Sequence, residues 1–153
     1  RRGDQPARLR ARPVTGHLFS RGPDDNAQAA GDHLAIGGTE AWPGKLIVHV
    51  GGAPPTKLPG TTDVPLRNWV PKESWHHVAL VRDGTSVAVY LDGRAEPEIA
   101  GGTAPPPVTE RVFIGGRSDG QDNFEGRIDE VAIYPRALPA EEIQKHYRAA
   151  VGD

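Results

Sequence analysis

The stretch WHHVALVRDGTSVAVYLDG, from Trp75 to Gly93, decides the fold of this chain. Two runs rich in β-branched residues flank Asp83-Gly84, and a second Asp-Gly pair ends the stretch. An Asp-Gly pair between two such runs is the strongest short-range signal for a β-hairpin, because the tight turn needs backbone angles that these residues tolerate. The stretch therefore predicts an antiparallel hairpin. Since its strands carry apolar residues on both faces, we expect them in the middle of a sheet, with Trp75 in the core.

The rest of the chain repeats this pattern of short apolar runs separated by turns. Its 19 glycines and 15 prolines favour brief strands joined by turns. Further strands are predicted at residues 7–12, 17–20, 33–36, 45–50, 111–114 and 127–134, the last of them also central. Proline cannot donate to a full ladder of hydrogen bonds, so the proline-rich stretches are predicted to be loops that cross between sheets. These loops are residues 54–55, 59–65 and 105–107.

The C-terminus is the one segment with a helical pattern. Pro139 suits the first helical position, and the two glutamates at 141 and 142 suit the positive end of a helix dipole. Ile143, Tyr147 and Ala150 share one face. We therefore expect an all-β domain closed by one short amphipathic helix, which packs against the back of the sheets.

Length and composition limit the number of domains and the class of partner. A chain of 153 residues with 37% hydrophobic and 25% charged residues is typical of one soluble globular domain, here spanning residues 1–153. The formal net charge of −2 provides no general field to collect nucleic acid. Five arginines lie within the first 12 residues, and a solvated terminal segment explains them more simply than a polyanion site.

Other features bear on location. No run approaches the about 20 apolar residues of a membrane-spanning helix. No cysteine is present, so the redox compartment stays undecided. The chain begins with two arginines and contains neither a methionine nor an apolar signal segment, so we expect it to be a piece of a longer protein.

Four motifs follow one another in the second half of the chain. They are WHHVALVRDG from Trp75, VYLDG from Val89, FEGRIDEVAIY from Phe124 and RAL from Arg136. In order and spacing they resemble the laminin G-like, concanavalin A-like lectin/glucanase family. The first half resembles this family more loosely, through HLFSR from residue 17, LAIG from residue 34 and GKL from residue 44.

This resemblance implies a two-sheet antiparallel jelly-roll sandwich, with N-terminal strands that are reduced or incomplete here. Family members are commonly joined covalently to other domains of a secreted, periplasmic or cell-surface protein, where they bind glycans or proteins. The leading hypothesis is therefore a carbohydrate-binding accessory domain. The alternatives are a protein-interaction or architectural domain without a sugar site and, more remotely, a glycoside-active enzyme.

The acidic and histidine residues favour a non-catalytic domain. Glycosidases of this fold place carboxylates at alternate positions of one strand, so that two acids face one cleft. Glu125, Asp129 and Glu130 do not have that spacing. His76 and His77 are adjacent in a predicted strand, so they point to opposite faces and cannot both bind one metal ion. We expect one imidazole in the core with a hydrogen-bonded partner and the other near the surface.

Aromatic and long polar side chains are the candidate ligand contacts, because aromatic faces stack on sugar rings or fill protein hot spots. The candidates are Trp42, Trp69, Phe124, Arg21, Arg117 and Asn123. For the three aromatic residues, packing in the core is the alternative role.

Two oxygen-rich segments are candidate calcium sites, because calcium takes six to eight oxygen ligands that loops deliver readily. The candidate ligands in them are Asp24, Asp25, Asp119 and Asp122. The family resemblance adds Asp129, which matches an aspartate that holds structural calcium in some members of the fold. Turn residues that bond their own backbone would have the same composition, and this reading stays open.

Overall fold

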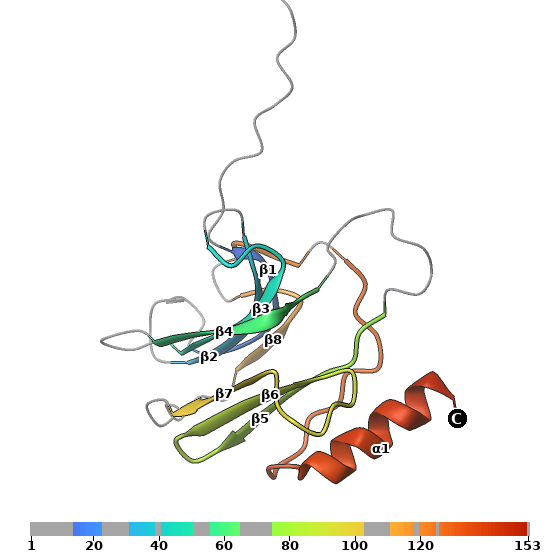
Figure 1. Cartoon of the computed structure of the whole chain (residues 1–153). Coiled ribbons are helices and arrows are strands. Elements are labelled where there is room, and N and C mark those ends of the chain that lie inside the picture. Colours follow the sequence, from blue (N-terminus) through green and yellow to red (C-terminus); the bar gives the residue numbers. More distant parts are fainter. Residues whose placement is uncertain are drawn as a thin grey trace, which may run out of the picture.

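The computed structural model describes residues 14–22, 31–38, 41–50, 56–64, 75–102, 111–117, 120–124 and 126–152. They form two antiparallel sheets that face each other and one C-terminal helix (Figure 1). The larger sheet has the order β4-β3-β2-β1-β8, with β1 Val14–Arg21, β2 Asp32–Gly37, β3 Lys45–Val50, β4 Thr56–Asp63 and β8 Val112–Ile114. The smaller sheet has the order β5-β6-β7, with β5 Val78–Asp83, β6 Ser86–Leu91 and β7 Ile99–Gly102. The predicted antiparallel sandwich is confirmed, whereas the strand predicted at residues 7–12 lies outside the described residues.

The core forms between the sheets because side chains along each strand alternate between its two faces. In β2, for example, Leu34 and Ile36 point inward and His33 points outward, and in β3 Val48 points inward. The buried cluster comprises Leu34, Ile36, Leu46, Val48, Val50, Val64, Val87, Val89, Leu91 and Ile99. Burying these apolar side chains is the main force that holds the two sheets together.

The predicted hairpin is present as β5 and β6. Asp83 pairs with Ser86 across the turn, and Gly84 adopts φ 54°, a left-handed angle that favours glycine. Only β6 lies in the middle of the smaller sheet, since β5 is at its edge among the described strands. The prediction that both strands are central is therefore confirmed for β6 and wrong for β5.

Trp75 is not a core residue. Its side chain is 57% exposed, because β5 begins three residues later at Val78 and Trp75 precedes the sheet. The prediction that Trp75 packs in the core is wrong.

Residues 127–134 do not form the predicted central strand. Ile128, Val131 and Ile133 are exposed, and Glu130 has φ 53°, which an extended strand does not accommodate. The carboxylate of Asp129 accepts a hydrogen bond of 2.9 Å from the backbone N–H of Glu130. A side chain that satisfies a backbone donor locally competes with the strand ladder, and this accounts for the failed prediction.

The loop predicted at residues 59–65 is also wrong over residues 59–63, because Thr56–Asp63 form β4. This strand lies at the edge of the larger sheet. An edge strand tolerates Pro59, since one side of the strand needs no hydrogen-bond donors.

Helix α1, Ala140–Val151, confirms the predicted helix, although Pro139 caps its start instead of occupying its first turn. Ile143 is fully buried, whereas Ala150 on the predicted face is exposed. The ring of Tyr147 lies 6.0 Å from that of His77, so the helix docks beside the start of β5 (Figure 1).

A largely buried ion pair crosses between the sheets. Arg82 of β5 binds Asp32 of β2, with Nη2 to Oδ1 at 2.5 Å and Nε to Oδ2 at 3.3 Å. This two-point contact joins strands that are far apart in the sequence. It fixes the lateral position of one sheet on the other, which apolar packing alone specifies less strictly.

We predict that Asp32→Ala destabilises the domain by about 3 kcal/mol, because it removes the carboxylate from a buried charge pair. Chemical denaturation at neutral pH measures the loss. The matched control is Asp63→Ala, which removes another short ion pair, Lys45 Nζ to Asp63 Oδ1 at 2.7 Å, from a carboxylate that is 80% exposed. The control should lose less than about 1 kcal/mol, and equal losses would contradict the bridging role of Asp32.

Candidate functional site

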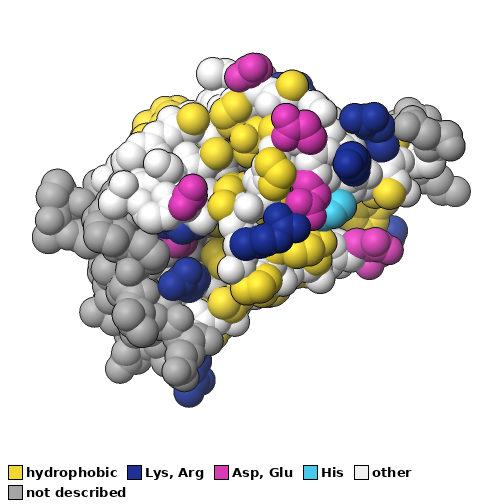
Figure 2. All heavy atoms as spheres, turned by 90° about the horizontal axis from the view of Figure 1, so that it is seen from below, with side chains coloured by type: hydrophobic (Ala, Val, Ile, Leu, Met, Phe, Trp, Pro, Cys, Tyr) yellow, Lys and Arg dark blue, Asp and Glu magenta, His cyan; other side chains and the backbone are white. Residues whose placement is uncertain are grey.

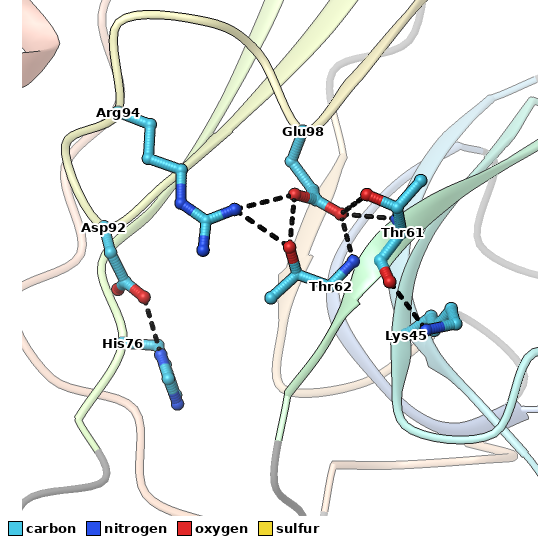
Figure 3. Close-up of polar contacts among 7 residues, drawn as sticks. All are labelled: Lys45, Thr61, Thr62, His76, Asp92, Arg94 and Glu98. Atoms are coloured by element: carbon cyan, nitrogen blue, oxygen red, sulfur yellow. Dashed lines mark hydrogen bonds and ion pairs between the residues drawn. The ribbon is translucent and has the colours of Figure 1, made fainter.

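A second polar contact between the sheets is centred on Glu98, immediately before β7. Its Oε1 accepts hydrogen bonds from the backbone N–H groups of Thr61 at 2.5 Å and Thr62 at 2.6 Å, while its Oε2 accepts one from the Thr62 hydroxyl at 2.7 Å. Arg94 Nη1 adds an ion pair to Oε2 at 3.2 Å and donates to Thr62 Oγ1 at 2.8 Å (Figure 3). We call Thr61, Thr62, Arg94 and Glu98 the Glu98 network.

The Glu98 network holds its carboxylate in the ionised state. The Glu98 side chain is only 4% exposed. Burial by itself would raise the pKa of Glu98, but the hydrogen bonds from the backbone and hydroxyl groups of Thr62 and Thr61 outweigh it and lower this pKa below its ordinary value. Glu98 is therefore a fixed anion at neutral pH, which orients the donors around it.

Arg94 is the member of the network that faces outward. Its side chain is about half exposed, and among the described contacts only Nη1 is engaged. A guanidinium carries five N–H donors, so Arg94 keeps donors that can bind a ligand while Glu98 fixes its position. Nearby, Lys45 Nζ contacts Thr61 O and Asp63 Oδ1, both at 2.7 Å, which brings two more exposed polar groups to this end of the sandwich.

His76 and Asp92 form a second polar pair beside Arg94 (Figure 3). His76 Nδ1 lies 2.9 Å from Asp92 Oδ2, and the backbone N–H of His77 donates to Asp92 Oδ1 at 3.0 Å. Asp92 holds this position with φ 52°. His76 Nε2 is buried and has no hydrogen-bond partner, which is uncommon enough to mark this atom as a candidate for ligand contact. The two histidines are both partly buried, so neither is the fully buried core residue that we expected.

Two exposed tryptophans lie at the same end of the sandwich. Trp42 is 38% exposed in the turn before β3, and the 57% exposed Trp75 directly precedes His76. Trp42 adopts φ 49°, an outlier for a bulky residue. The turn is held by a 3.0 Å hydrogen bond from Lys45 N to Trp42 O, and a Cβ at Gly37 would lie 2.0 Å from that same oxygen. The backbone of Trp42 is therefore fixed in a strained conformation.

Strand register places these groups together. The first residue of β3, Lys45, pairs with the last residue of β4, Asp63, and the first residue of β5, Val78, pairs with the last residue of β6, Leu91. The Glu98 network then joins these ends of the two sheets. We call the resulting surface the tryptophan end, and its outer members are Trp42, Lys45, Asp63, Trp75, His76, Asp92 and Arg94.

The chemistry of the tryptophan end suits recognition. A general acid must carry a proton near neutral pH, and the lowered pKa of Glu98 prevents this. The rings and the fixed donors instead offer stacking surfaces beside oriented hydrogen-bonding groups, the combination that small polar ligands such as sugars need.

The structure separates the ligand contacts predicted from the sequence. Trp42 lies at the tryptophan end, whereas Arg117, Asn123 and Phe124 lie beside β1 at the other side of the larger sheet. Asn123 bridges to His17, and Phe124 N donates to Gly115 O at 2.9 Å. Phe124 packs against the core, as its alternative role supposed. Arg21 ends β1, and Trp69 lies outside the described residues.

Sequence analysis missed Trp75, Thr62, Arg94 and Glu98 as members of a site. Trp75 opens the predicted hairpin strand, and that pattern assigned it to the core. The Glu98 network carried no signal, because Thr61 and Thr62 are 37 and 36 residues away from Glu98 in the chain.

The two candidate calcium ligands among the described residues, Asp122 and Asp129, have separate partners. Asp129 is exposed and bonds the neighbouring Glu130 N–H, and the backbone carbonyl of Asp122 accepts from His17 N at 2.9 Å. Asp24, Asp25 and Asp119 lie outside the described residues. Within the described part of the chain, no three histidine or carboxylate side chains are grouped so that they could hold a metal ion. The calcium site stays a prediction.

The fold and the residues of its core define an antiparallel β-sandwich domain. Residues 8–144 match the profile of the concanavalin A-like lectin/glucanases superfamily, in its laminin G form. The chain belongs to this superfamily, as the motifs in its second half indicated.

Other comparisons add little. A search of curated proteins found no match. Among solved structures, an S-layer domain-containing protein from Clostridium thermocellum is similar at 18% identity and a TM-score of 0.43, over 95% of this chain and 69% of that chain. The family assignment rests on the profile alone. No helix among the described residues has the length and hydropathy needed to cross a membrane.

We predict that Glu98→Gln destabilises the domain by about 2 kcal/mol at pH 7, because an amide oxygen replaces a carboxylate that accepts several hydrogen bonds. Since the folded pKa of Glu98 is lowered, its contribution is complete above pH 4.5 and is lost as the pH falls through the folded pKa. Denaturation between pH 7 and pH 3 should therefore show the wild type and the variant converging in acid. A constant difference at all pH values would contradict the ionised state.

Proposed function

We propose that this domain is a non-catalytic carbohydrate-binding module, and that the tryptophan end binds the glycan. The observation that carries the proposal is the pair of exposed tryptophans at the strand ends that the Glu98 network joins, where Glu98 holds Arg94 in place. The Trp42 side chain is exposed and its backbone is strained. Backbone strain of about 1–3 kcal/mol persists where the surrounding structure imposes it, and such strained residues cluster at functional sites.

The same proposal covers the setting of the domain. Members of this superfamily commonly accompany other domains, and a module of this kind holds a larger protein on a glycan outside the cell. We propose that this chain acts in a secreted, periplasmic or cell-surface protein. The described carboxylates of the tryptophan end all have partners, since Glu98 is buried and ionised, Asp63 is paired with Lys45 and Asp92 with His76, and this suits a role in binding.

A protein-interaction role is the second candidate, and one observation favours it. A shallow hollow of about 320 Å³ lies over the smaller sheet, with Val81, Ala88 and Ala100 in its lining. Figure 2, which views the molecule from below, shows hydrophobic side chains gathered across the middle of the face, with charged side chains around them. Apolar patches of this kind mark contact surfaces in many soluble proteins.

We predict that Trp42→Ala and Trp75→Ala each weaken binding to a neutral glycan by about tenfold, because each removes a stacking surface. A glycan array on the whole chain selects the ligand, and calorimetry measures the variants. Tyr134→Ala is the matched control, since this exposed ring lies beside α1 and stacks on His146. Both tryptophan variants should keep their stability to within about 1 kcal/mol.

Two outcomes would reject the glycan site. One is an array without any glycan signal, and the other is a tryptophan variant that binds as well as the wild type. Loss of binding after Val81→Asp, together with unchanged binding in the tryptophan variants, would favour the hollow over the smaller sheet.

We also propose a structural calcium ion, and predict that excess chelator lowers the melting temperature and that millimolar calcium restores it. A ligand that binds only the folded state stabilises it by mass action. Asp122→Asn should abolish the response, whereas Asp63→Asn, at the tryptophan end, should leave it intact. A melting temperature that changes with neither chelator nor calcium would contradict the site.

A further inference from the structure

Helix α1 docks through a small contact where β6 ends and β5 begins. Ile143 of α1 is fully buried, and the ring of Tyr147 lies 6.0 Å from the ring of His77. Tyr147 also lies against the turn after β6, because a Cβ at Gly93 would be 2.3 Å from its Cδ1 atom. Only a residue without a Cβ lets the ring come this close. The docking contact therefore includes His77 and Gly93.

The helical backbone of α1 depends on this docking. The helix has 12 residues, and a helix of that length is only marginally stable in water without tertiary packing. Tyr134 stacks on His146 at 5.5 Å and Arg136 pairs with Glu142. Both of these contacts tie the helix to the segment just before it and not to a sheet. Weakening the contact with His77 and Gly93 therefore releases the helix.

His77 is a titratable member of the docking contact. Its side chain is partly buried, and its Nδ1 atom is buried without a hydrogen-bond partner among the described residues. A neutral imidazole tolerates this position, since it can keep its proton on the other ring nitrogen. An imidazolium carries a proton on both nitrogens, so it would bury an N–H donor without an acceptor and destabilise the docked state.

The groups that face His77 do not favour its protonation. From α1, Tyr147 presents its ring, and the charge of His146 disfavours a second charge on His77. At the end of β6, Asp92 attracts a charge, but its two oxygens are already engaged by the backbone N–H of His77 and by His76 Nδ1. Burial, followed by the charge of His146, lowers the pKa of His77 below 6.5, and Asp92 opposes this shift without reversing it. The docked helix thus favours a neutral His77.

We propose that His77 is a pH-sensitive switch for the docking of α1. In mild acid its imidazole becomes protonated, the contact with Tyr147 opens, and the helix leaves the start of β5. Release uncovers Ile143, Tyr147 and the turn at Gly93. The uncovered surface adjoins the tryptophan end, because His76 and Asp92 are the chain neighbours of His77 and Gly93. The switch goes beyond the proposed function and does not require a glycan.

Linkage gives the direction and the size of the effect. In the released state the imidazole regains its ordinary pKa of 6.5, whereas in the docked state its pKa is lower. Docking is therefore strongest above pH 6.5 and weakens as the pH falls from 6.5 toward the pKa of the docked state. One pH unit below 6.5, a single histidine shifts the docking equilibrium by at most about tenfold.

Hydrogen exchange of the whole chain, followed by NMR, tests the switch, because a released helix loses the protection of its backbone amides. In the wild type, the protection factors of the amides from Ile143 to Tyr147 should fall about three- to tenfold between pH 7.5 and pH 5.5. His77→Phe keeps a ring against Tyr147 but cannot take up a proton. Its protection factors should therefore change by less than about twofold over the same range.

The matched control is His49→Gln. His49 is another histidine with a lowered pKa, but it lies in β3 of the larger sheet, so this variant should keep the wild-type response of α1. The proposal is overturned if the protection of wild-type α1 does not change with pH or if His77→Phe keeps the fall. It is also overturned if His49→Gln abolishes the fall, since the whole domain would then loosen in acid. Circular dichroism verifies folding, and His77→Gln replaces the phenylalanine variant if that one does not fold. No glycan is present, so the result is independent of the proposed glycan site.

Discussion

Two buried carboxylates, Asp32 and Glu98, fasten one sheet to the other, and the remaining structure depends on how each is satisfied. Each comes from a different sheet and receives donors from the opposite one, Asp32 from Arg82 and Glu98 from Thr61 and Thr62. Apolar packing between the sheets tolerates some sliding, because many pairs of aliphatic side chains make equivalent contacts. A buried anion does not, because a small shift would leave a charge without its donors. The apolar core thus supplies most of the stability, and the carboxylates select one arrangement of the sheets.

The Glu98 network also connects stability with recognition. Glu98 binds two backbone N–H groups of β4, so the end of that strand keeps its position relative to the smaller sheet. The same carboxylate holds Arg94, which faces solvent, and a surface arginine without such a partner would sample many rotamers. The entropy of ordering this side chain is therefore lost on folding and not when a ligand binds. This is the physical reason to look for binding at the tryptophan end.

The sequence predicts what depends on neighbours along the chain. An Asp-Gly turn predicts the hairpin of β5 and β6. Alternating apolar residues predict the other strands of the core, and a 3.6-residue period predicts helix α1. Three predictions failed because tertiary context reversed a local tendency. Pro59 was placed in a loop but lies in an edge strand, the segment around Glu130 was placed in a strand but contains a left-handed residue, and Trp75 was placed in the core but precedes the sheet. The Glu98 network could not be predicted, because it requires β4 and the start of β7, which are distant in the sequence, to lie together.

Alternation along the strands of the larger sheet assigns its two faces to different tasks. In β2, Asp32, Leu34 and Ile36 face inward and join the smaller sheet, so the outward position of His33 is fixed by the same register that builds the core. A shift of one residue would place His33 between the sheets and take Leu34 and Ile36 out of the core, at a large cost in free energy. Ala35 and Ile47 point outward and are also buried, so both faces of β2 and β3 are covered there.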